Sequence, residues 1–328
     1  MKVKNALLSA LAGAGEGYIS GFALAAQLGV SRSAVWKAVK ALEAEGYTIE
    51  SVTAKGYRLS GDNDRLSAEL IGKALHTEKL GRELFVHDEI GSTNTAAKEL
   101  AGQGAPHGTT VVADRQTAGR GRMGRSFVSP SGTGIYMSIV IRPEFGIELA
   151  PMMTSAAACA VAKAVERLSG SPTQIKWVND VYMAGRKICG ILTEASFGLE
   201  AKTLDYAVIG IGINVRSVKT TLDEELRAVA TSVEDACGAR LDRSRLCGEV
   251  LCQLERYLGM IENGGFLADY RRRELLTGNR ITANVGARPI EGEAIGIDDS
   301  ANLIVRLDSG EEVHLSSGEA SLCRIKGR

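Results

Sequence analysis

The sequence has no excess of either sign of charge, since 39 basic side chains stand against 39 acidic ones in 328 residues. With zero formal charge, no global field draws the chain to nucleic acid or to a membrane surface, so any such attraction has to be local. No run of about 18 uninterrupted apolar residues occurs, which argues against a transmembrane helix. Near the amino terminus, Leu7, Leu8 and Leu11 follow helical spacing, and this apolar run is short and weak for a signal peptide.

Cysteine is used without any pattern. The six cysteines form no CxxC pair and have no histidine at a spacing that would complete a zinc site. We therefore expect reduced, mostly buried thiols in a cytoplasmic protein rather than a disulfide framework. Apolar residues make up 45% of the chain and charged residues 24%, which is ordinary for a globular protein with two or three domains.

Residues 1–63 are typical of a winged helix-turn-helix. The pattern predicts a helix that ends at Leu28, a turn at Gly29-Val30, a second helix that begins at Ser31, and then a two-stranded ribbon over residues 47–59. Residues 1–60 hold seven basic side chains against four acidic ones, and the excess lies mostly on the second helix and the ribbon. This layout places one helix in the major groove and the wing on the DNA backbone.

The second helix has an apolar face and a polar one. Val35, Val39 and Leu42 recur at i, i+4 and i+7, which buries one face, and Ser31 is a good N-cap. The alternative to DNA binding is a helical dimerisation domain whose exposed lysines are only solvated. The residues that we expect to contact operator DNA are Ser31, Arg32, Ser33, Lys37, Lys40 and Lys55.

The rest of the chain changes character twice. A polar, turn-rich stretch over residues 60–67 is a plausible linker, and extended and helical runs then alternate up to residue 274, which predicts a domain built round one sheet. From residue 275, short strands with glycine and Asp-Asp turns suit a small β-barrel. The prediction is a multidomain α+β protein with a winged helix-turn-helix (1–63), a mixed α/β domain (64–274) and a small SH3-like β-barrel (275–328).

The stretch DRQTAGRGRMGRSF, residues 114–127, interleaves arginines with glycines. Like charges repel and glycine costs backbone entropy, so a bound anion is the expected compensation, held by backbone N–H groups and guanidinium donors. The alternatives are a disordered segment that touches RNA and a solvated loop. Convincing strands at residues 109–114 and 134–142 enclose the stretch, which favours an anion site in an ordered loop.

Three further patterns indicate either polar groups that could contact a ligand or a strand that another group approaches closely. Ser92, Thr93 and Asn94 stand at a strand-to-helix turn, where they cap the helix or offer hydrogen bonds to a small polar ligand. Lys176 and Lys187 follow, and such lysines are usually solvated charges at a strand edge. The run GIGINV, residues 210–215, lacks the third glycine of a dinucleotide fingerprint, so its glycines indicate a strand that a ligand or another backbone approaches.

The motifs GSTN, QTAGRGRMGR, KWVND, RKICGIL and GIGINV occur in the order seen in biotin–protein ligases. With the N-terminal winged helix and a terminal GEASLCRI, essentially the whole chain resembles the bacterial family of bifunctional biotin ligases and biotin operon repressors. The family usually has proline where this chain has Val178, and often tryptophan where Phe127 follows the arginines. Neither departure removes a catalytic group.

The resemblance implies a two-step reaction. The carboxylate of biotin attacks the α-phosphate of ATP, which is used with Mg²⁺, and a lysine on the biotin carrier domain of a carboxylase then attacks biotinyl-5′-adenylate. It also implies a homodimer on operator DNA when the adenylate is bound, with residues 134–142 as the strand edge that pairs. A lipoate–protein ligase and a ligand-sensing repressor without catalysis remain the alternatives.

The resemblance also implies roles for individual residues. The catalytic candidates are Lys187, Arg122 and Lys176. The biotin-binding candidates are Ser92, Thr93, Asn94, Gln116, Gly119, Arg120, Gly121, Arg122 and Lys187. ATP or the adenylate is expected at Arg120, Arg122, Arg125, Asp180 and Asn214, with no resident metal site and the Mg²⁺ of ATP near Asp180.

Overall fold

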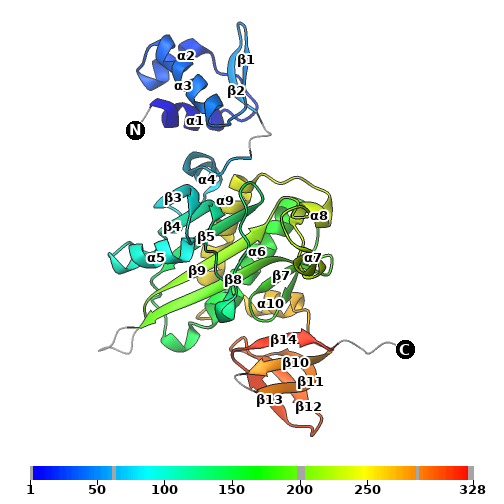
Figure 1. The fold of residues 1–328 in the computed structure, drawn as a ribbon. Coiled ribbons are helices and arrows are strands. Elements are labelled where there is room, and N and C mark those ends of the chain that lie inside the picture. Colours follow the sequence, from blue (N-terminus) through cyan, green and yellow to red (C-terminus); the bar gives the residue numbers. More distant parts are fainter. Residues whose placement is uncertain (1–2, 61–63, 198–203, 286–287, 324–328) are drawn as a thin grey trace. The chain divides into compact units, whose positions relative to one another are not determined.

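The computed structural model describes residues 3–60, 64–197, 204–285 and 288–323 (Figure 1). The chain divides into two compact units, Met1–His76 with Leu241–Glu249, and Thr77–Arg240 with Val250–Arg328. The expected linker over 60–67 includes residues 61–63, which lie outside the described residues, and the domain boundaries at 63 and 274 stay predictions.

The first unit contains the helix-turn-helix and the ribbon that the pattern predicts. Ser31 caps the second of these helices, because its Oγ accepts a hydrogen bond from the N–H of Ala34, and Gly29 ends the helix before it in the left-handed conformation. The elements are α1 (Val3–Gly13), α2 (Gly21–Leu28), α3 (Arg32–Ala44), β1 (Ile49–Val52), β2 (Gly56–Leu59) and α4 (Ala68–Ala74).

The core of this unit lies between α1, α2, α3 and the ribbon. Its predicted members Val35, Val39 and Leu42 are each about 1% exposed, so the apolar face of α3 is confirmed. Leu70 of α4 packs against the same cluster, half-buried. The polar face of α3 is thereby turned to solvent.

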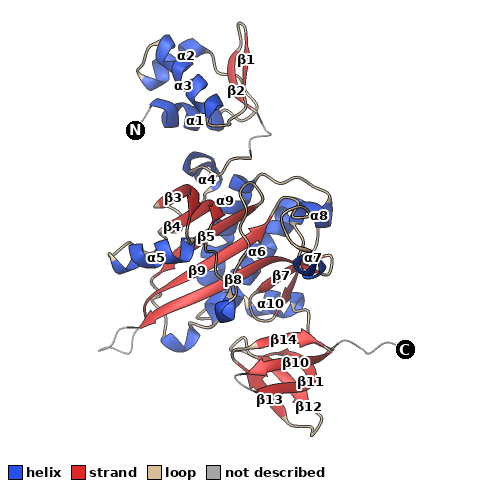
Figure 2. Ribbon diagram, in the orientation of Figure 1, coloured by secondary structure: helices blue, strands red, loops and turns tan. Residues whose placement is uncertain are grey.

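The second unit is built round a mixed seven-stranded sheet with the strand order β3-β4-β5-β9-β8-β7-β6 (Figure 2). β3 and β4 are parallel because α5 (Thr93–Gly102) connects them, and the other neighbours are antiparallel. The expectation of one sheet is confirmed. The strands are β3 (Leu84–Ile90), β4 (Thr110–Gln116), β5 (Gly134–Ile141), β6 (Gln174–Lys176), β7 (Asp180–Met183), β8 (Arg186–Phe197) and β9 (Leu204–Asn214).

β5 is an interior strand of this sheet. It pairs with β4 along one edge and with β9 along the other, and all of its residues are buried. The prediction that residues 134–142 supply an edge for pairing between two copies is therefore wrong, since both rows of backbone groups are already used. The continuous apolar run GIYMSIVI fits a strand that is covered on both faces.

Helices cover both faces of the large sheet. Ser138 of β5 donates a hydrogen bond to Asn94 of α5, whereas Thr154 of α6 donates one to Thr193 of β8. Ser138 lies in a cross-strand row with Gly210 and Leu192, so Thr193 points to the opposite face. The remaining helices are η1 (Arg122–Gly124), η2 (Ile147–Leu149), α6 (Met152–Ser169), α7 (Glu224–Val229), α8 (Val233–Cys237), α9 (Arg243–Leu258) and α10 (Leu267–Arg273).

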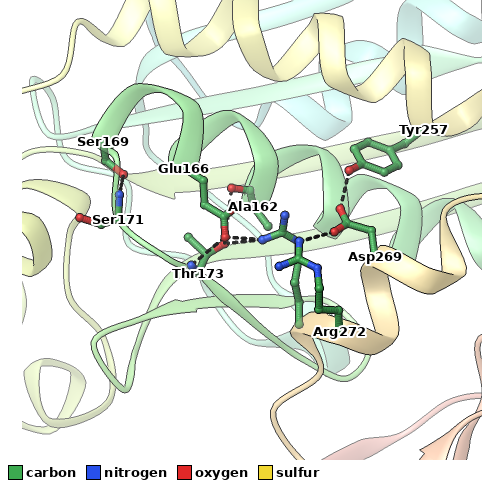
Figure 3. A network of polar contacts seen from close by, with 9 residues as sticks. Ala162, Glu166, Ser169, Ser171, Thr173, Tyr257, Asp269 and Arg272 are labelled. Carbon is green, nitrogen blue, oxygen red and sulfur yellow. Dashed lines mark hydrogen bonds and ion pairs between the residues drawn. The ribbon is translucent and has the colours of Figure 1, made fainter.

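A buried ion-pair network joins α6, α9 and α10 (Figure 3). The side chain of Arg273 is 1% exposed and pairs with Glu166 and, at 3.3 Å, with Asp269, which also accepts a hydrogen bond from Tyr257. Burial alone would raise the pKa of Glu166, but hydrogen bonds from Arg273 and Thr173 hold it below its ordinary value. The network therefore keeps a charged pair inside the unit.

The C-terminal strands form an antiparallel sheet with the order β13-β12-β11-β10-β14. The strands are β10 (Arg280–Val285), β11 (Arg288–Ile297), β12 (Leu303–Leu307), β13 (Glu312–Leu315) and β14 (Glu319–Leu322). Within residues 280–285 and 288–323, no pairing between β13 and β14 closes the sheet into a barrel. This region is thus a small five-stranded β-sheet domain, tied to the rest of its unit by the hydrogen bond from Trp177 to the carbonyl of Ala301.

All six cysteines lie among the described residues, and none of them is in a disulfide bond, as the spacing predicts. Cys159, Cys189 and Cys247 are buried and the other three are half-buried. Burial raises the pKa of Cys247 to about 12, so its thiol stays protonated near neutrality. In the part of the chain that the structure describes, no helix is both long and apolar enough to cross a membrane.

Candidate functional site

A cavity lies on the face of the large sheet that α5 covers, beside residues 117–133, which we call the arginine loop. About 480 Å³ of empty space lies within it, part of which is open to solvent. Its polar lining is Ser92, Thr93, Asn94, Gln116, Arg120, Arg122, Asn179 and Lys187. Its apolar lining is Phe127, Met137, Ile191, Leu192 and Ile211, and its glycines are Gly121, Gly190, Gly210 and Gly212.

Two glycines of β9 make room for the side chains that shape this cavity. A Cβ at Gly210 would stand 2.0 Å from Oδ1 of Asn94, and one at Gly212 would stand 2.6 Å from the ring of Phe127. Because alternate residues of a strand share a face, both glycines open the same side of the sheet. The sequence predicts that a ligand or another backbone approaches GIGINV, whereas the nearest atoms at these two glycines belong to the side chains of Asn94 and Phe127.

Asn94 is held at both ends of its amide group. Its Nδ2 donates to Glu194 at 2.9 Å, and its Oδ1 accepts from Ser138 at 2.5 Å. Burial alone would raise the pKa of Glu194, but Lys98, paired at 2.7 Å, and Asn94 hold it below its ordinary value. Since its hydrogen bonds are made inside the protein, Asn94 forms a rigid wall of the cavity.

Gln116 closes the start of α5. Its Oε1 accepts hydrogen bonds from the backbone N–H of Thr93 at 2.9 Å and from the hydroxyl of Thr93 at 3.1 Å. Ser92 occupies the N-cap position but makes no side-chain cap hydrogen bond. The capping group is thus Gln116 rather than the Ser-Thr-Asn run, and the hydroxyl of Ser92 is left at the cavity lining.

The arginine loop directs its three arginines differently. Arg120 and Arg122 line the cavity, and Arg122 donates to Oδ1 of Asn179 at 3.1 Å. Arg125 instead forms two hydrogen bonds of 2.7 Å with Glu319 of the C-terminal sheet. Met123 has a φ of 56°, in the left-handed region, so the chain turns sharply between the second and third arginine.

The loop glycines are not equivalent. A Cβ at Gly119 would stand 2.4 Å from the carbonyl oxygen of Phe127, so only glycine fits there. A Cβ at Gly121 would meet nothing closer than 3.5 Å. Gly119 therefore holds the loop together, although it does not line the cavity, whereas Gly121 does line it.

Lys187 brings the third positive charge to the cavity. Its Nζ lies 2.7 Å from Oδ1 of Asp180, which does not itself line the cavity. Lys176 lies outside the lining as well, and burial lowers the pKa of its ammonium while the charges of Asp180 and Glu319 oppose that effect. At this end of the cavity, the positive charges of Lys176 and Lys187 therefore lie close to the carboxylates of Asp180 and Glu319.

Asn214 joins Gly119, Arg125, Lys176 and Asp180 as predicted residues that do not line the cavity, and some residues that do line it had no predicted role. Asn214 is buried, donates to the carbonyl of Thr231 at 3.1 Å and does not line the cavity. Asn179 and Phe127 line it, although sequence reasoning gave neither a role. Both stand inside motifs that had drawn notice, KWVND and the end of the arginine stretch, so their position in those motifs was the available signal.

The residues predicted to contact DNA lie on α3 and the ribbon. Arg32, Ser33, Lys37 and Lys40 are exposed on α3, and Lys40 pairs with Glu43 at 2.6 Å. Ser31 uses its hydroxyl as the cap of α3. In the ribbon, Lys55 lies over the ring of Tyr18 at 5.9 Å from its centre.

Three family models match the chain: the Biotin/lipoate A/B protein ligase family over residues 86–214, an HTH domain over 4–58 and the Biotin protein ligase C terminal domain over 277–323. The bifunctional ligase/repressor BirA of Bacillus subtilis is 39% identical, with 94% of this chain and 95% of the relative covered. The biotin–[acetyl-CoA-carboxylase] ligase of Mycobacterium tuberculosis is 33% identical over 79% of this chain and 97% of its own. Among solved structures, the biotin protein ligase of Aquifex aeolicus in complex with biotin and ATP has a TM-score of 0.62, with 29% identity over 74% of this chain and 99% of that chain. The chain therefore belongs to the family of bifunctional biotin ligase/repressors.

Proposed function

We propose that the chain is an ATP-dependent biotin–protein ligase and a biotin-responsive repressor. The observation that carries the ligase function is the convergence of Arg120, Arg122 and Lys187 on a cavity whose other lining is neutral and apolar. Biotin has a neutral polar ring system, an apolar side chain and a carboxylate. These three parts of biotin match the hydroxyl and amide groups, the apolar wall and the three cations of the cavity, respectively.

The reaction has two steps. First, a carboxylate oxygen of biotin attacks the α-phosphorus of ATP, the bond to the bridging oxygen breaks, and pyrophosphate leaves as biotinyl-5′-adenylate forms. Next, the neutral amine of a lysine on the carrier domain attacks the carbonyl carbon, AMP leaves, and the amide loses its extra proton. Lys187 neutralises the meeting carboxylate and phosphate oxygens, and Arg120 and Arg122 hold the adenylate. Each charge-assisted hydrogen bond contributes about 1.5–3 kcal/mol.

The remaining site residues have supporting roles in this proposal. Ser92, Thr93 and Gln116 hold the ring system of biotin, and Asn94 fixes the wall beside them. Gly119 and Gly121 let the arginine loop fold over the adenylate and exclude water. Lys176 adds positive charge, and Asn214 and Arg125 support the nucleotide from outside the cavity lining. Within the described residues, no three His, Cys, Asp or Glu side chains gather to hold a metal ion. In the proposal Mg²⁺ accompanies ATP as part of the co-substrate, and Asp180 is the carboxylate assigned near it.

One experiment tests the ligase function. The protein is mixed with biotin, ATP and a biotin carrier domain for a single turnover, and pyrophosphate and biotinylated carrier are measured. Neither product would contradict the proposal and favour a ligand-sensing repressor without catalysis, whereas pyrophosphate without a biotinylated carrier would contradict the transfer step alone. The other alternative, a lipoate–protein ligase, is tested in the same assay with lipoate and a lipoate carrier domain in place of biotin and its carrier. A lipoate–protein ligase would modify the lipoate carrier and not the biotin carrier.

The repressor function rests on the exposed basic face of α3 and on the ribbon. A single winged helix with an excess of three positive charges binds DNA weakly, so two copies on half-sites are needed. We propose that the adenylate promotes this dimer. Because β5 is interior, the contact uses another part of the chain, for which β3 at the edge of the described sheet is available. Gel shift with DNA from upstream of the protein's own gene, with and without biotin and ATP, tests it.

The proposal also covers the shape of the C-terminal sheet and the location of the protein in the cell. We infer that the C-terminal sheet curves towards an SH3-like barrel, which the register shift in β11 between Ala294 and Gly296 supports, because bulges bend strands. We place the protein in the cytoplasm, where ATP, carrier domains and operator DNA are all present.

A further inference from the structure

Trp36 is the aromatic side chain on the exposed face of α3. It is 53% exposed, whereas Trp177, the other tryptophan of the chain, is 3% exposed. About half of this large apolar side chain is thus turned to solvent, although it stands near the middle of the helix. The indole is therefore available for an external contact.

The neighbours of Trp36 are the residues expected on DNA. Arg32 and Ser33 precede it by four and three residues, and Lys40 follows by four, so all of them share its face of the helix. These positions are exposed, while Val35 and Val39 beside them are buried. An indole thus stands at the centre of a surface that is otherwise polar and basic.

The charges around the indole identify the kind of partner. Lys40 is paired with Glu43, and for Arg32 and Lys37 the described part of the chain offers no acidic partner within ion-pair distance. Such a surface fits a partner that is anionic at its rim and apolar at its centre. The major groove of DNA has this pattern, because phosphates flank it and the methyl groups of thymine lie on its floor.

We propose that Trp36 reads thymine methyl groups in the major groove and so sets part of the operator specificity. The inference rests on the repressor function proposed above. Arg32, Lys37 and Lys40 supply affinity for phosphates, and this affinity does not depend on the DNA sequence. The indole supplies an apolar contact that is favourable with the methyl group of thymine and with no other base. A second copy of the chain is the other partner that could cover Trp36.

The test compares two versions of the upstream DNA fragment, one synthesised with dTTP and one with dUTP, which lacks every thymine methyl group. Full-length protein with biotin and ATP should bind the thymine fragment about fourfold more tightly for each contacted methyl group. Trp36→Ala should bind both fragments equally, and Trp36→Phe should restore part of the preference. Phe22→Ala is the matched control, because Phe22 is 75% exposed but lies on α2, and it should keep the wild-type preference.

The outcomes separate the two proposals. If the wild-type protein binds neither fragment in preference to unrelated DNA, both the repressor function and the inference about Trp36 are wrong. If it binds the operator but does not distinguish thymine from uracil, or if Trp36→Ala keeps the full preference, only the inference fails. A change in sedimentation mass of Trp36→Ala without DNA, with an unchanged thymine preference, would assign the indole to a contact between copies instead.

Discussion

Gly210 offers the sharpest test of how the cavity is built. In Gly210→Ala the new Cβ would stand 2.0 Å from Oδ1 of Asn94, a distance that no pair of such atoms tolerates. Asn94 has no easy way to move, because Ser138 and Glu194 hold both ends of its amide at 2.5 and 2.9 Å. Overpacking costs about 1–3 kcal/mol. Breaking buried hydrogen bonds adds about 1–3 kcal/mol.

We therefore expect Gly210→Ala to lower the free energy of unfolding by about 2–6 kcal/mol and to weaken biotin binding. Urea unfolding followed by near-UV circular dichroism measures the first effect, and isothermal titration with biotin measures the second. Gly121→Ala is the control, since its Cβ would meet nothing closer than 3.5 Å, and it should unfold within about 0.5 kcal/mol of wild type.

A double substitution isolates the clash. Asn94→Ala alone should destabilise the protein by about 1–3 kcal/mol, because Ser138 and Glu194 lose their partner. In that background the space beside Gly210 is open, so adding Gly210→Ala should cost less than about 1 kcal/mol. Strict additivity of the two substitutions, or wild-type stability of Gly210→Ala, would refute the reasoning.

The other predictions concern charges. Lys187→Ala should slow pyrophosphate release in a single turnover far more than it weakens ATP binding, and a rate within about threefold of wild type would remove Lys187 from the reaction. Arg122→Gly should lose the bound adenylate faster and biotinylate unrelated lysines, so retention of the adenylate and full selectivity for the carrier would contradict the clasp. Glu166→Gln removes one of the two carboxylates that pair with the buried Arg273, the other being Asp269, and should lower the free energy of unfolding by about 1.5–3 kcal/mol at neutral pH. Because the pKa of Glu166 is depressed in the folded protein, its contribution is fully present above the ordinary pKa of a glutamate and is lost as the pH falls through the folded pKa. The difference in stability from wild type should therefore shrink in acid below the ordinary glutamate pKa, and an equal difference there and at neutral pH would contradict the reasoning.

Much of the architecture could be predicted because each element carries its own local pattern. The runs at 84–90 and 151–170, for example, differ in period and length, and they form β3 and α6. The cap at Ser31 and the apolar face that follows it are equally local, and both are confirmed. Elements whose signal lies within a dozen residues can be predicted from the chain alone.

The order of strands could not be predicted in the same way. GIYMSIVI fits any strand covered on both faces, and whether it lies inside a sheet or at its rim depends on strands that are distant in sequence. Its partner β9 begins at Leu204, and the two are joined only through long-range pairing. The openness of the C-terminal sheet has the same origin, because closure depends on a pairing between its two outermost strands.

The three arginines of the loop were indistinguishable in sequence, and the structure separates them by the partner that each one has. Arg125 donates two hydrogen bonds to the carboxylate of Glu319, and it does not line the cavity. Arg122 donates to the neutral amide of Asn179, and it lines the cavity. A phosphate or carboxylate that enters the cavity adds a full opposite charge, which an amide oxygen does not have, so redirecting Arg122 to the ligand breaks no ion pair. Redirecting Arg125 would break one. The protein itself therefore compensates part of the positive charge of the loop, through the pair of Arg125 with Glu319. The guanidinium of Arg122 can still leave Asn179 and bind an anionic ligand in the cavity.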